Sequence, residues 1–373
     1  EIVRVEVLAA QTRGIRLTSF PAIIEELLLP GKLPLVVCGT HGKTTTTSLM
    51  SWVAESCGLK PGFLIGGIPK NFTNSFRNPG ANTFVIEGDE YDTAFFDKRS
   101  KFLHYRPFRA ILTSVEFDHA DIFAGLPEVR AAFAAFVDTL DPAGDLVVNM
   151  DSPDAMGIAA GARCTVLRYR VLPEGDTDVG SAEYCASVRS KAGARRTVFE
   201  LYEHGQSLGE FSTQLTGSYN IGNVAAAAAV ARRQGVDPER LREAIRRFRG
   251  VKRRQELLGL AQGVRVISDF AHHPTAVQLT VRAMRRRFPE SALHVCFEPR
   301  SASSRRAVFF DGYAEAFAMA SRVYVGPLFH PEKIPAELRL DPPALARAIA
   351  GHGVEAGAYA SVDELGIAVL NQV

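Results

Sequence analysis

Cysteine is scarce in this sequence, and the few cysteines stand far apart. The 373 residues include five cysteines, and no two of them form a C-x-x-C pair. This spacing argues against a zinc ribbon and against a disulfide framework. It is typical of a protein of the reducing cytoplasm, which is the location we expect. The five are Cys38, Cys57, Cys164, Cys185 and Cys296.

Long apolar runs, a leader pattern and a large net charge are also lacking. No run approaches the roughly twenty apolar residues that cross a bilayer, and the charged start EIVRVEVLAA has no signal-peptide pattern. The formal net charge is only +2, so bulk electrostatics favour neither nucleic acid nor a membrane as a partner. Because Glu1 is not an initiator methionine, we expect an N-terminus that is processed, truncated or unobserved.

Length and alternating patterns predict an α/β protein of more than one domain. A chain of 373 residues is too long for one comfortable core. After a strand-like start over residues 2–7 and an amphipathic helix over 22–29, apolar strand patterns alternate with helical ones, which indicates a parallel sheet covered on both faces. We expect residues 171–213 to form an antiparallel excursion from this sheet. The expected strands are Leu35–Cys38, Thr83–Glu87, Ala110–Val115 and Leu146–Asn149.

A second alternating unit follows a glycine at position 250. Its expected strands are 264–268, 293–298 and 322–325, with helices over 274–287 and 307–319 between them. We therefore divide the chain into residues 1–33, the tail of a preceding domain with a linker, 34–249, a central domain, and 250–373, a C-terminal domain.

The segment Leu35–Ser48, LVVCGTHGKTTTTS, predicts a phosphate-binding loop. A buried strand, a glycine loop and a helix in that order present backbone N–H groups and a helix N-terminus to an anion. Lys43 adds a charge for the outer phosphates, and the Thr44 hydroxyl is a ligand for Mg²⁺. We expect Lys43 to lie exposed in the loop, so that replacing it removes activity and leaves the fold intact.

Acidic and imidazole side chains follow the next two strands of the central unit. Because the carboxyl ends of parallel strands face one crevice, both groups are expected beside the phosphate loop. So many carboxylates near an anion need a cation, and Mg²⁺ is the expected one. The two groups are Glu87, Asp89, Glu90 and Asp92, and then Glu116, Asp118, His119 and Asp121.

Two further motifs, DFAHHPTA and FEPRSASSRR, follow strands of the C-terminal unit. The first places Asp269, His272 and His273 at a strand end, and the second offers Arg300. The histidine pair is open to three interpretations, namely metal ligation, contact with substrate or nucleotide, and simple packing. No third metal ligand at a suitable spacing is visible in the sequence.

Seven motifs together resemble the Mur ligases, the ATP-dependent amide-forming enzymes of peptidoglycan synthesis. They are GTHGKTT, EGDEYD, EFDHADIF, GSYNIGNVAAAAAVA, GVKRRQE, DFAHHPTAV and FEPRSASSRR, in family order. The resemblance implies a central P-loop ATP-binding α/β domain and a C-terminal Rossmann-like α/β domain. The family's N-terminal UDP-sugar domain, with its glycine-rich turn, is largely missing before Glu1, and the C-terminal end looks short.

The resemblance also implies roles for individual residues. Glu87 and His119 would complete the magnesium site begun by Thr44, and Asn223 would face the adenine. Arg254 and Asp269 would approach the nucleotide from the C-terminal domain. The triphosphate would be held by Gly39, Thr40, His41, Gly42, Lys43, Thr44 and Thr45. The residues expected at the chemistry are Lys43, Glu87, His119, His272 and Arg300, with His273 beside them where the amine arrives.

Within the family, the sequence is most similar to the branch that joins UDP-N-acetylmuramate to the recycled tripeptide L-alanyl-γ-D-glutamyl-meso-diaminopimelate. Like that branch and the alanine-adding branch, it has no lysine over 120–140, where several Mur ligases carry a carbamylated lysine. The expected reaction uses ATP and Mg²⁺ and passes through an acyl phosphate. Two alternatives stay open: a ligase for free L-alanine, and a non-catalytic nucleotide-binding relative.

Overall fold

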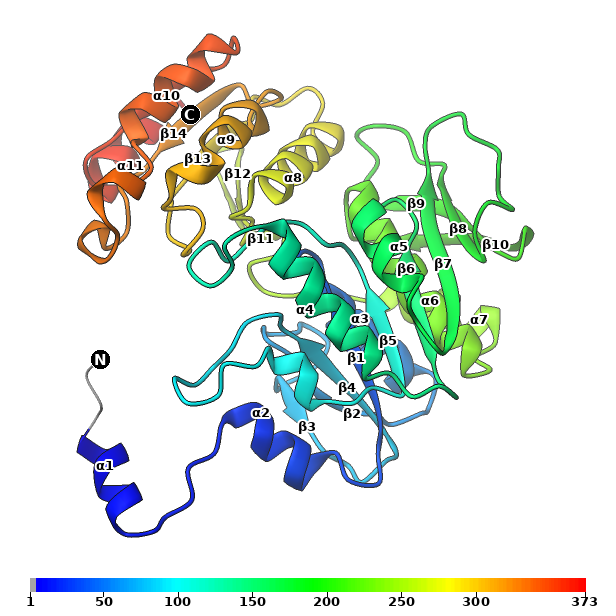
Figure 1. Ribbon diagram of the computed structural model, residues 1–373. Coiled ribbons are helices and arrows are strands. Elements are labelled where there is room, and N and C mark those ends of the chain that lie inside the picture. The colour runs from blue at the N-terminus through cyan, green and yellow to red at the C-terminus, as the bar shows by residue number, and fades with distance from the viewer. Residues whose placement is uncertain (1–4) are drawn as a thin grey trace.

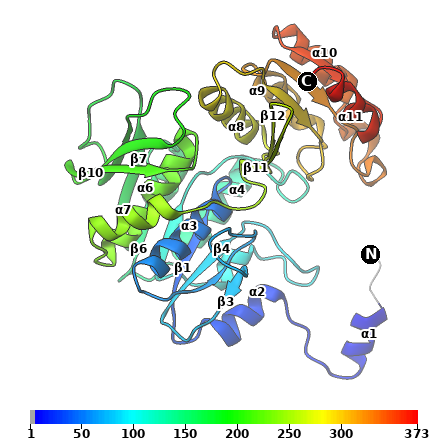
Figure 2. The same cartoon turned by 180° about the vertical axis from the view of Figure 1, so that it is seen from behind.

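The computed structural model describes residues 5–373 of the chain. At its start, α1 (Val5–Thr12) stands apart from the body of the molecule in both views (Figures 1 and 2). The expected strand over 2–7 is wrong for residues 5–7, which are helical, and residues 2–4 lie outside the described part. The expected helix over 22–29 is present as α2 (Phe20–Ile23) and a π-helical turn, η1 (Ile24–Leu28).

A ten-stranded sheet forms the centre of the molecule. Its order is β10-β9-β8-β7-β6-β5-β1-β4-β2-β3, and the four expected strands are present as β1, β4, β5 and β6. The bounds are β1 Leu33–Cys38, β2 Gly62–Leu64, β3 Phe76–Arg77, β4 Thr83–Gly88, β5 Arg109–Leu112, β6 Asp145–Asn149, β7 Thr165–Leu172, β8 Tyr184–Val188, β9 Thr197–Glu203 and β10 Gln206–Thr213.

Strand β1 lies between β4 and β5 and runs parallel to both. Cys38, its last residue, is in register with Gly88 of β4 and with Leu112 of β5. The three strands therefore end at one level, and the segments that follow them emerge side by side. This register sets the phosphate loop beside the two acidic segments.

The stretch over 171–213 is part of the main sheet, which corrects the expected excursion. Strand β7 pairs with β6, and β8 pairs with β7, in both cases in parallel. Only β9 and β10 run antiparallel, and they form one edge of the sheet. Strands β9 and β10 mix buried with more exposed residues, because this edge of the sheet is only partly covered.

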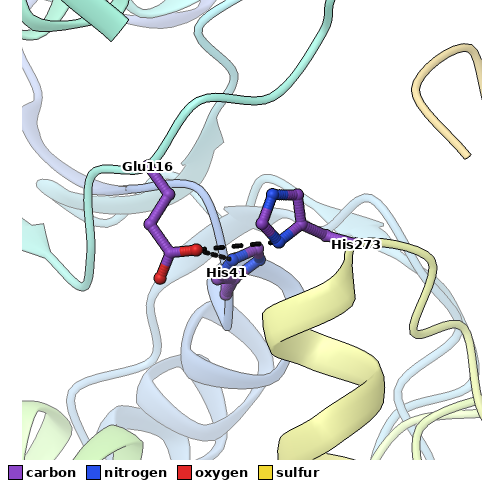
Figure 3. Close-up of side chains that lie close together, drawn as sticks. All are labelled: His41, Glu116 and His273. Carbon is purple, nitrogen blue, oxygen red and sulfur yellow. Dashed lines mark hydrogen bonds and ion pairs between the residues drawn. The ribbon is translucent and has the colours of Figure 1, made fainter. Parts of the chain in front are cut away.

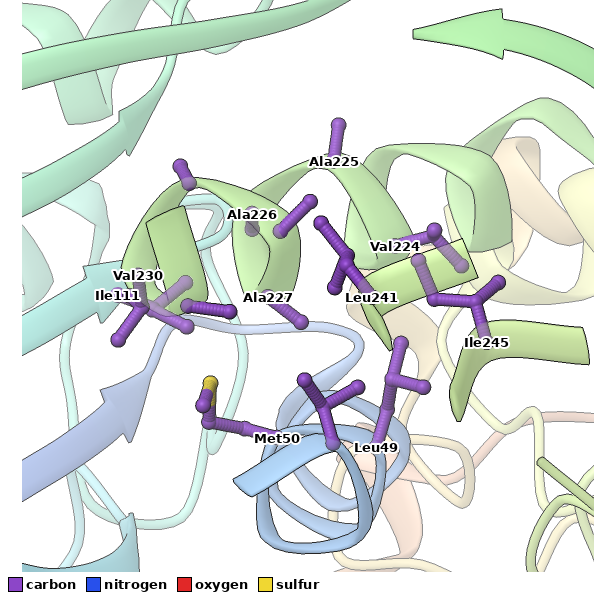
Figure 4. Close-up of a cluster of buried hydrophobic side chains, with 14 of the residues drawn as sticks. Leu49, Met50, Ile111, Val224, Ala225, Ala226, Ala227, Val230, Leu241 and Ile245 are labelled. Atoms are coloured by element: carbon purple, nitrogen blue, oxygen red, sulfur yellow. The ribbon is translucent and has the colours of Figure 1, made fainter. Parts of the chain in front are cut away.

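Helices cover the two faces of the sheet. Helices α3 (Lys43–Ser56), α6 (Ser218–Arg233) and α7 (Pro238–Arg247) contribute to one buried core, while α4 (Leu126–Asp138) and α5 (Pro153–Ala159) contribute to the other. In Figure 4 the small side chains Ala225, Ala226 and Ala227 allow α6 to lie close against α3 and the sheet. Alanine suits this position because it combines high helix propensity with little bulk.

The C-terminal unit has a smaller parallel sheet in the order β13-β14-β15. In Figure 1 it lies at the end of the central unit with α8 nearest to that unit. Its elements are β11 Glu256–Ala261, β12 Val264–Ser268, α8 Pro274–Arg287, β13 His294–Phe297, η3 Ala307–Phe309, α9 Phe310–Ala316, β14 Arg322–Val325, η4 Pro331–Lys333, η5 Ala336–Leu338, α10 Pro342–Gly351, β15 Glu355–Ala358 and α11 Val362–Leu370.

The strand expected over 264–268 is present, but its partner differs from expectation. Strand β12 pairs antiparallel with β11 as a hairpin and is not a member of the three-stranded parallel sheet. Gly263, at φ +86°, supplies the left-handed conformation that the tight connection needs. Within residues 5–373, no helix is both long and apolar enough to cross a membrane.

Candidate active site

Two glycines shape the phosphate loop. Gly39 has φ +127°, and a Cβ there would lie 2.1 Å from the Thr113 hydroxyl. Gly42 has φ +82°, and a Cβ there would lie 2.7 Å from Oδ1 of Asn223. Helix α3 begins at the next residue, Lys43. The glycines therefore allow the loop to fold tightly and leave the N-terminal N–H groups of α3 directed at an anion.

Lys43 lies in a buried ion pair, which corrects the expectation of an exposed loop lysine. Its Nζ donates to the Gly39 carbonyl at 2.7 Å and lies 2.9 Å from Oε2 of Glu90. The two side chains are 12% and 3% exposed. Burial lowers the pKa of Lys43, but the carboxylates of Glu90 and Asp89 outweigh burial and hold this pKa above its ordinary value.

The Thr44 hydroxyl joins two other functional side chains. It donates to Oε1 of Glu87 at 2.7 Å, and it accepts from Nη2 of Arg254 at 3.3 Å. The other oxygen of Glu87 accepts from the backbone N–H of Gly66 at 2.8 Å. Burial and the nearby Asp89 raise the pKa of Glu87. A hydroxyl and a carboxylate at this separation can both serve as oxygen ligands of a Mg²⁺ ion that also binds phosphate.

His119 is connected to the phosphate loop through Glu90. Its Nε2 lies 3.4 Å from Oε1 of Glu90, whose other oxygen holds Lys43. Burial lowers the pKa of His119, but Glu90 and Asp118 outweigh burial and raise it. Its backbone has φ +53°, and its N–H donates to the Ser303 hydroxyl at 3.0 Å. The structure thus brings Lys43 and His119 to opposite oxygens of one buried carboxylate.

A cavity of about 520 Å³ opens beside the loop, between the central and C-terminal units. Its wall includes the segment that follows β5, parts of α6, the turn after Gly250 and the start of α8. This volume is in the range of cofactor and substrate sites. Seven of the predicted nucleotide-binding residues line it, namely His41, Gly42, Thr44, Thr45, Asn223, Arg254 and Asp269.

Arg254 and Asp269 reach this cavity from the C-terminal unit. The guanidinium of Arg254 lies over the Phe270 ring, 5.0 Å from its centroid. Asp269 accepts from the backbone N–H groups of Gln255 and Ala271 at 2.8 and 2.7 Å. Burial raises the pKa of Asp269. Asp269 therefore fixes the backbone on both sides of the β11–β12 hairpin and thereby the position from which Arg254 extends.

The two adjacent histidines have different environments. Nδ1 of His272 donates to the Phe270 carbonyl at 2.9 Å, and Nε2 lies 3.9 Å from Asp118. His273 caps helix α8, and its Nε2 donates to the Phe117 carbonyl at 3.1 Å. Burial lowers the pKa of both, that of His273 to about 4. Both rings therefore lie against the segment that follows β5.

Arg300 lies on the surface of the C-terminal unit and does not line the cavity. Its side chain is 61% exposed and lies 3.5 Å from Glu298. Its guanidinium sits 4.1 Å from the centroid of the Phe329 ring. A role for Arg300 at the arriving amine stays a prediction.

Several residues that the structure places here have no role that the sequence predicted. Glu90 is the buried partner of Lys43, and the Ser303 hydroxyl donates to Asp118 across the two units. Thr275 Oγ1 donates to Glu116 at 2.7 Å. Glu90 and Glu116 stand in the acidic segments, so the sequence carried a signal for them. Nothing in the sequence distinguished Ser303 from its neighbouring serines.

The fold and the site together define a class of protein, and the comparison of the sequence with family models identifies the same class. Residues 37–231 match the Mur ligase middle domain, and residues 253–372 match the Mur ligase, glutamate ligase domain. The chain belongs to the Mur ligase family, whose members are ATP-dependent ligases that form amide bonds.

Comparisons with individual relatives are more specific than the match to the family models. The chain is 37% identical over 333 residues to "UDP-N-acetylmuramate--L-alanyl-gamma-D-glutamyl-meso-2,6-diaminoheptandioate ligase" of Escherichia coli (strain K12), covering 88% of this chain and 69% of the relative. The solved murein peptide ligase of Psychrobacter arcticus 273-4 superposes with a TM-score of 0.69 at 28% identity, covering 100% of this chain and 78% of that one. "UDP-N-acetylmuramate--L-alanine ligase" of Kineococcus radiotolerans is 34% identical, covering 86% of this chain and 64% of the relative.

Proposed function

We propose that this protein uses ATP to join the carboxylate of UDP-N-acetylmuramate to the amino group of L-alanyl-γ-D-glutamyl-meso-diaminopimelate. The printed function of the Escherichia coli relative supports this substrate pair. The observation that carries the proposal is the position of the Thr44 hydroxyl, which lies 2.7 Å from Glu87 and 3.3 Å from Arg254. A loop threonine, an acidic strand end and a residue of the second unit therefore meet at one point.

The residues around that point suit phosphoryl transfer with magnesium. Thr44 and Glu87 offer oxygen ligands, and we assign His119 to the same magnesium site. Lys43 and Arg254 supply positive charge, while the N-terminus of α3 supplies N–H donors. In the bound state Mg²⁺ neutralises phosphate charge. The donor set fits such an ion because it consists mainly of hard oxygen atoms and keeps room for phosphate.

The proposed reaction has two transfers. The muramyl carboxylate attacks the γ-phosphorus of ATP, which forms an acyl phosphate and releases ADP. The neutral α-amine of the peptide then attacks the acyl carbon, and inorganic phosphate leaves as the amide forms and the amine loses a proton. Carboxylate and amine do not condense in water at neutral pH, so ATP supplies the driving force, and the site must align the reactants and neutralise phosphoryl charge.

We assign these tasks to separate parts of the chain. Residues 34–249 hold the triphosphate, and residues 250–373 bring Arg254 and Asp269 to the nucleotide and present the peptide. We assign residues 1–33 to the connection with a UDP-sugar-binding domain. Asn223, which lines the cavity beside Gly42, would face the adenine.

The experiment compares two amines with the full-length protein. We expect kcat/KM for the tripeptide to exceed that for free L-alanine at least tenfold, which requires only about 1.4 kcal/mol of differential transition-state binding. A preference for free L-alanine would move the protein to the alanine-adding branch, which the 34% identical Kineococcus radiotolerans relative represents. Absence of phosphate release with either amine, in the presence of UDP-N-acetylmuramate, would instead indicate a non-catalytic nucleotide-binding protein.

A further inference from the structure

His41, Glu116 and His273 form a cluster whose grouping is not explained by the roles expected above for His41 at the triphosphate and for His273 near the arriving amine. His41 lies in the phosphate loop, Glu116 follows β5, and His273 caps α8 in the C-terminal unit. Each side chain offers one ligand atom, and the three atoms lie within 4.8 Å of one another. Figure 3 shows the two imidazole rings on one side of the Glu116 carboxylate, with a nitrogen of each ring facing the same carboxylate oxygen. Two imidazoles and a carboxylate are the ligand types of a three-residue zinc site.

The separations are close to those of a tetrahedral site. Oε2 of Glu116 lies 3.3 Å from Nε2 of His41 and 3.6 Å from Nδ1 of His273. Ligands bound to Zn²⁺ at about 2.0–2.1 Å lie about 3.3–3.4 Å apart along the edge of a tetrahedron. The two ring centroids are 4.8 Å apart, at an interplanar angle of 44°. The ligand nitrogens of the two histidines lie within 4.8 Å of each other, so the two rings would move closer together to share one ion.

The Nε2 nitrogen of His273 already makes the kind of hydrogen bond that metal-binding histidines commonly make. Its Nε2 donates to the backbone carbonyl of Phe117 at 3.1 Å. This hydrogen bond puts the ring proton on Nε2 and leaves the Nδ1 lone pair on the side of Glu116. A histidine that ligates a metal commonly donates its other N–H to a carbonyl in this manner. Nδ1 accepts the N–H of Thr275 at 3.3 Å and thereby caps helix α8, so a bound metal would replace this capping hydrogen bond.

We propose that His41, Glu116 and His273 bind a divalent transition metal of the Zn²⁺ class. Two nitrogen donors favour Zn²⁺ or Co²⁺ over Mg²⁺, which prefers oxygen ligands in octahedral geometry. His41 and Glu116 also line the cavity, so a fourth position on the metal opens toward it. The site differs in every residue from the magnesium site assigned to Thr44, Glu87 and His119, and it does not depend on the ligase activity.

Such an ion would connect the two units of the molecule. His41 and Glu116 belong to the central unit, and His273 belongs to helix α8 of the C-terminal unit. Thr275, the second residue of the same helix, already donates to Glu116 at 2.7 Å. The bound metal would therefore hold the phosphate loop against α8 and stabilise the folded protein by an amount that grows with the logarithm of the metal concentration once that exceeds Kd.

Cobalt provides the test, because tetrahedral Co²⁺ absorbs strongly in the visible region. The full chain is treated with a chelator and titrated with Co²⁺, and Zn²⁺ is then added to displace it. We expect a tetrahedral spectrum that Zn²⁺ abolishes, and at least about tenfold weaker binding in His273→Gln and in Glu116→Gln. Thermal unfolding without metal checks that each variant folds, and His41→Gln replaces either variant that does not fold.

Two control variants separate this site from its neighbours. His272→Gln changes the adjacent histidine, whose Nε2 faces Asp118 at 3.9 Å, and His119→Gln changes the assigned magnesium site. Both should bind Co²⁺ as the unchanged protein does. Absence of a tetrahedral spectrum would overturn the proposal. Loss of binding in either control together with retention in His273→Gln would also overturn it.

Discussion

Individual residues at this site act through buried charge. Glu90 is 2% exposed and holds Lys43 with one oxygen and His119 with the other. Burial raises the pKa of Glu90, but Lys43 and His119 outweigh burial and hold it below its ordinary value. A carboxylate kept ionised in this way fixes Lys43 and His119 before any phosphate arrives. The loop lysine therefore contributes to the fold as well as to the chemistry.

Replacing Lys43 should cost both activity and stability. We expect Lys43→Ala to lower kcat about 10²–10³-fold, because the charge that neutralises phosphate is lost. The variant should also lose about 3–5 kcal/mol of unfolding free energy, because Glu90 is left buried without its cation. Steady-state kinetics and denaturant unfolding measure the two effects.

The double variant Lys43→Met, Glu90→Gln is the matched control. It should recover most of the stability, since no buried charge is left unpaired, and it should stay inactive. Recovery of activity in the double variant would contradict the role of Lys43 at the phosphates.

Replacing Glu87 should change the dependence on magnesium. Glu87→Gln keeps the shape that accepts the Thr44 hydroxyl and removes the negative charge, so the Mg²⁺ concentration for half-maximal activity should rise at least about tenfold. Initial rates at saturating substrates over a range of Mg²⁺ concentrations measure this. His119→Gln should shift the same curve, and an unchanged curve in both variants would remove them from the metal site.

Helices and strands form where the local sequence pattern and the tertiary contacts favour the same structure. The expected helix over 274–287 and the expected strand over 322–325 have the predicted bounds, because capping and proline signals mark the helix start and a β-branched run marks the strand. The pairing of each strand within a sheet was less predictable from the sequence than the position of the strand in the chain. The hairpin of β11 and β12 and the parallel pairing of β8 depend on contacts that no short segment specifies.

The start of helix α3 can be tested with two glycines of equal conformation. Gly42 and Gly58 both have φ +82°, but only a Cβ at Gly42 meets a neighbour, Oδ1 of Asn223 at 2.7 Å. Both Gly→Ala changes should cost about 1–2 kcal/mol of stability through the left-handed backbone. Only Gly42→Ala should weaken ADP binding, measured by calorimetry, since only there must the loop shift. Equal ADP affinity in both variants would contradict this reading.

The whole molecule places its site between two units, and three of the polar contacts between the units lie around the site. His273 donates to the Phe117 carbonyl, Thr275 to Glu116 and Ser303 to Asp118. These contacts all involve the segment after β5. Interfaces made of a few polar contacts permit relative motion of domains. We therefore expect the segment after β5 to report on the distance between the units.

Removing the Ser303 hydroxyl should loosen this arrangement. Ser303→Ala leaves the buried Asp118 carboxylate without one donor, a loss of about 1.5–3 kcal/mol for a hydrogen bond to a charged group. The radius of gyration from small-angle scattering should rise relative to the unchanged protein, and ATP with Mg²⁺ should reverse the change. Ser301→Ala is the control, because Ser301 bonds to Ser304 within its own loop. Identical profiles for all three proteins would indicate a rigid pair of units.

The sequence by itself determined the α/β class, the phosphate loop and the segments that carry acidic and imidazole residues. These features are local: glycine spacing, apolar periodicity and strand ends are written in consecutive residues. Only the tertiary structure decided which side chains meet. Lys43 pairs with Glu90 at a separation of 47 positions, and Thr44 meets Arg254 at a separation of 210. Such contacts follow from strand order and from the packing of two units, which no single segment of the chain encodes.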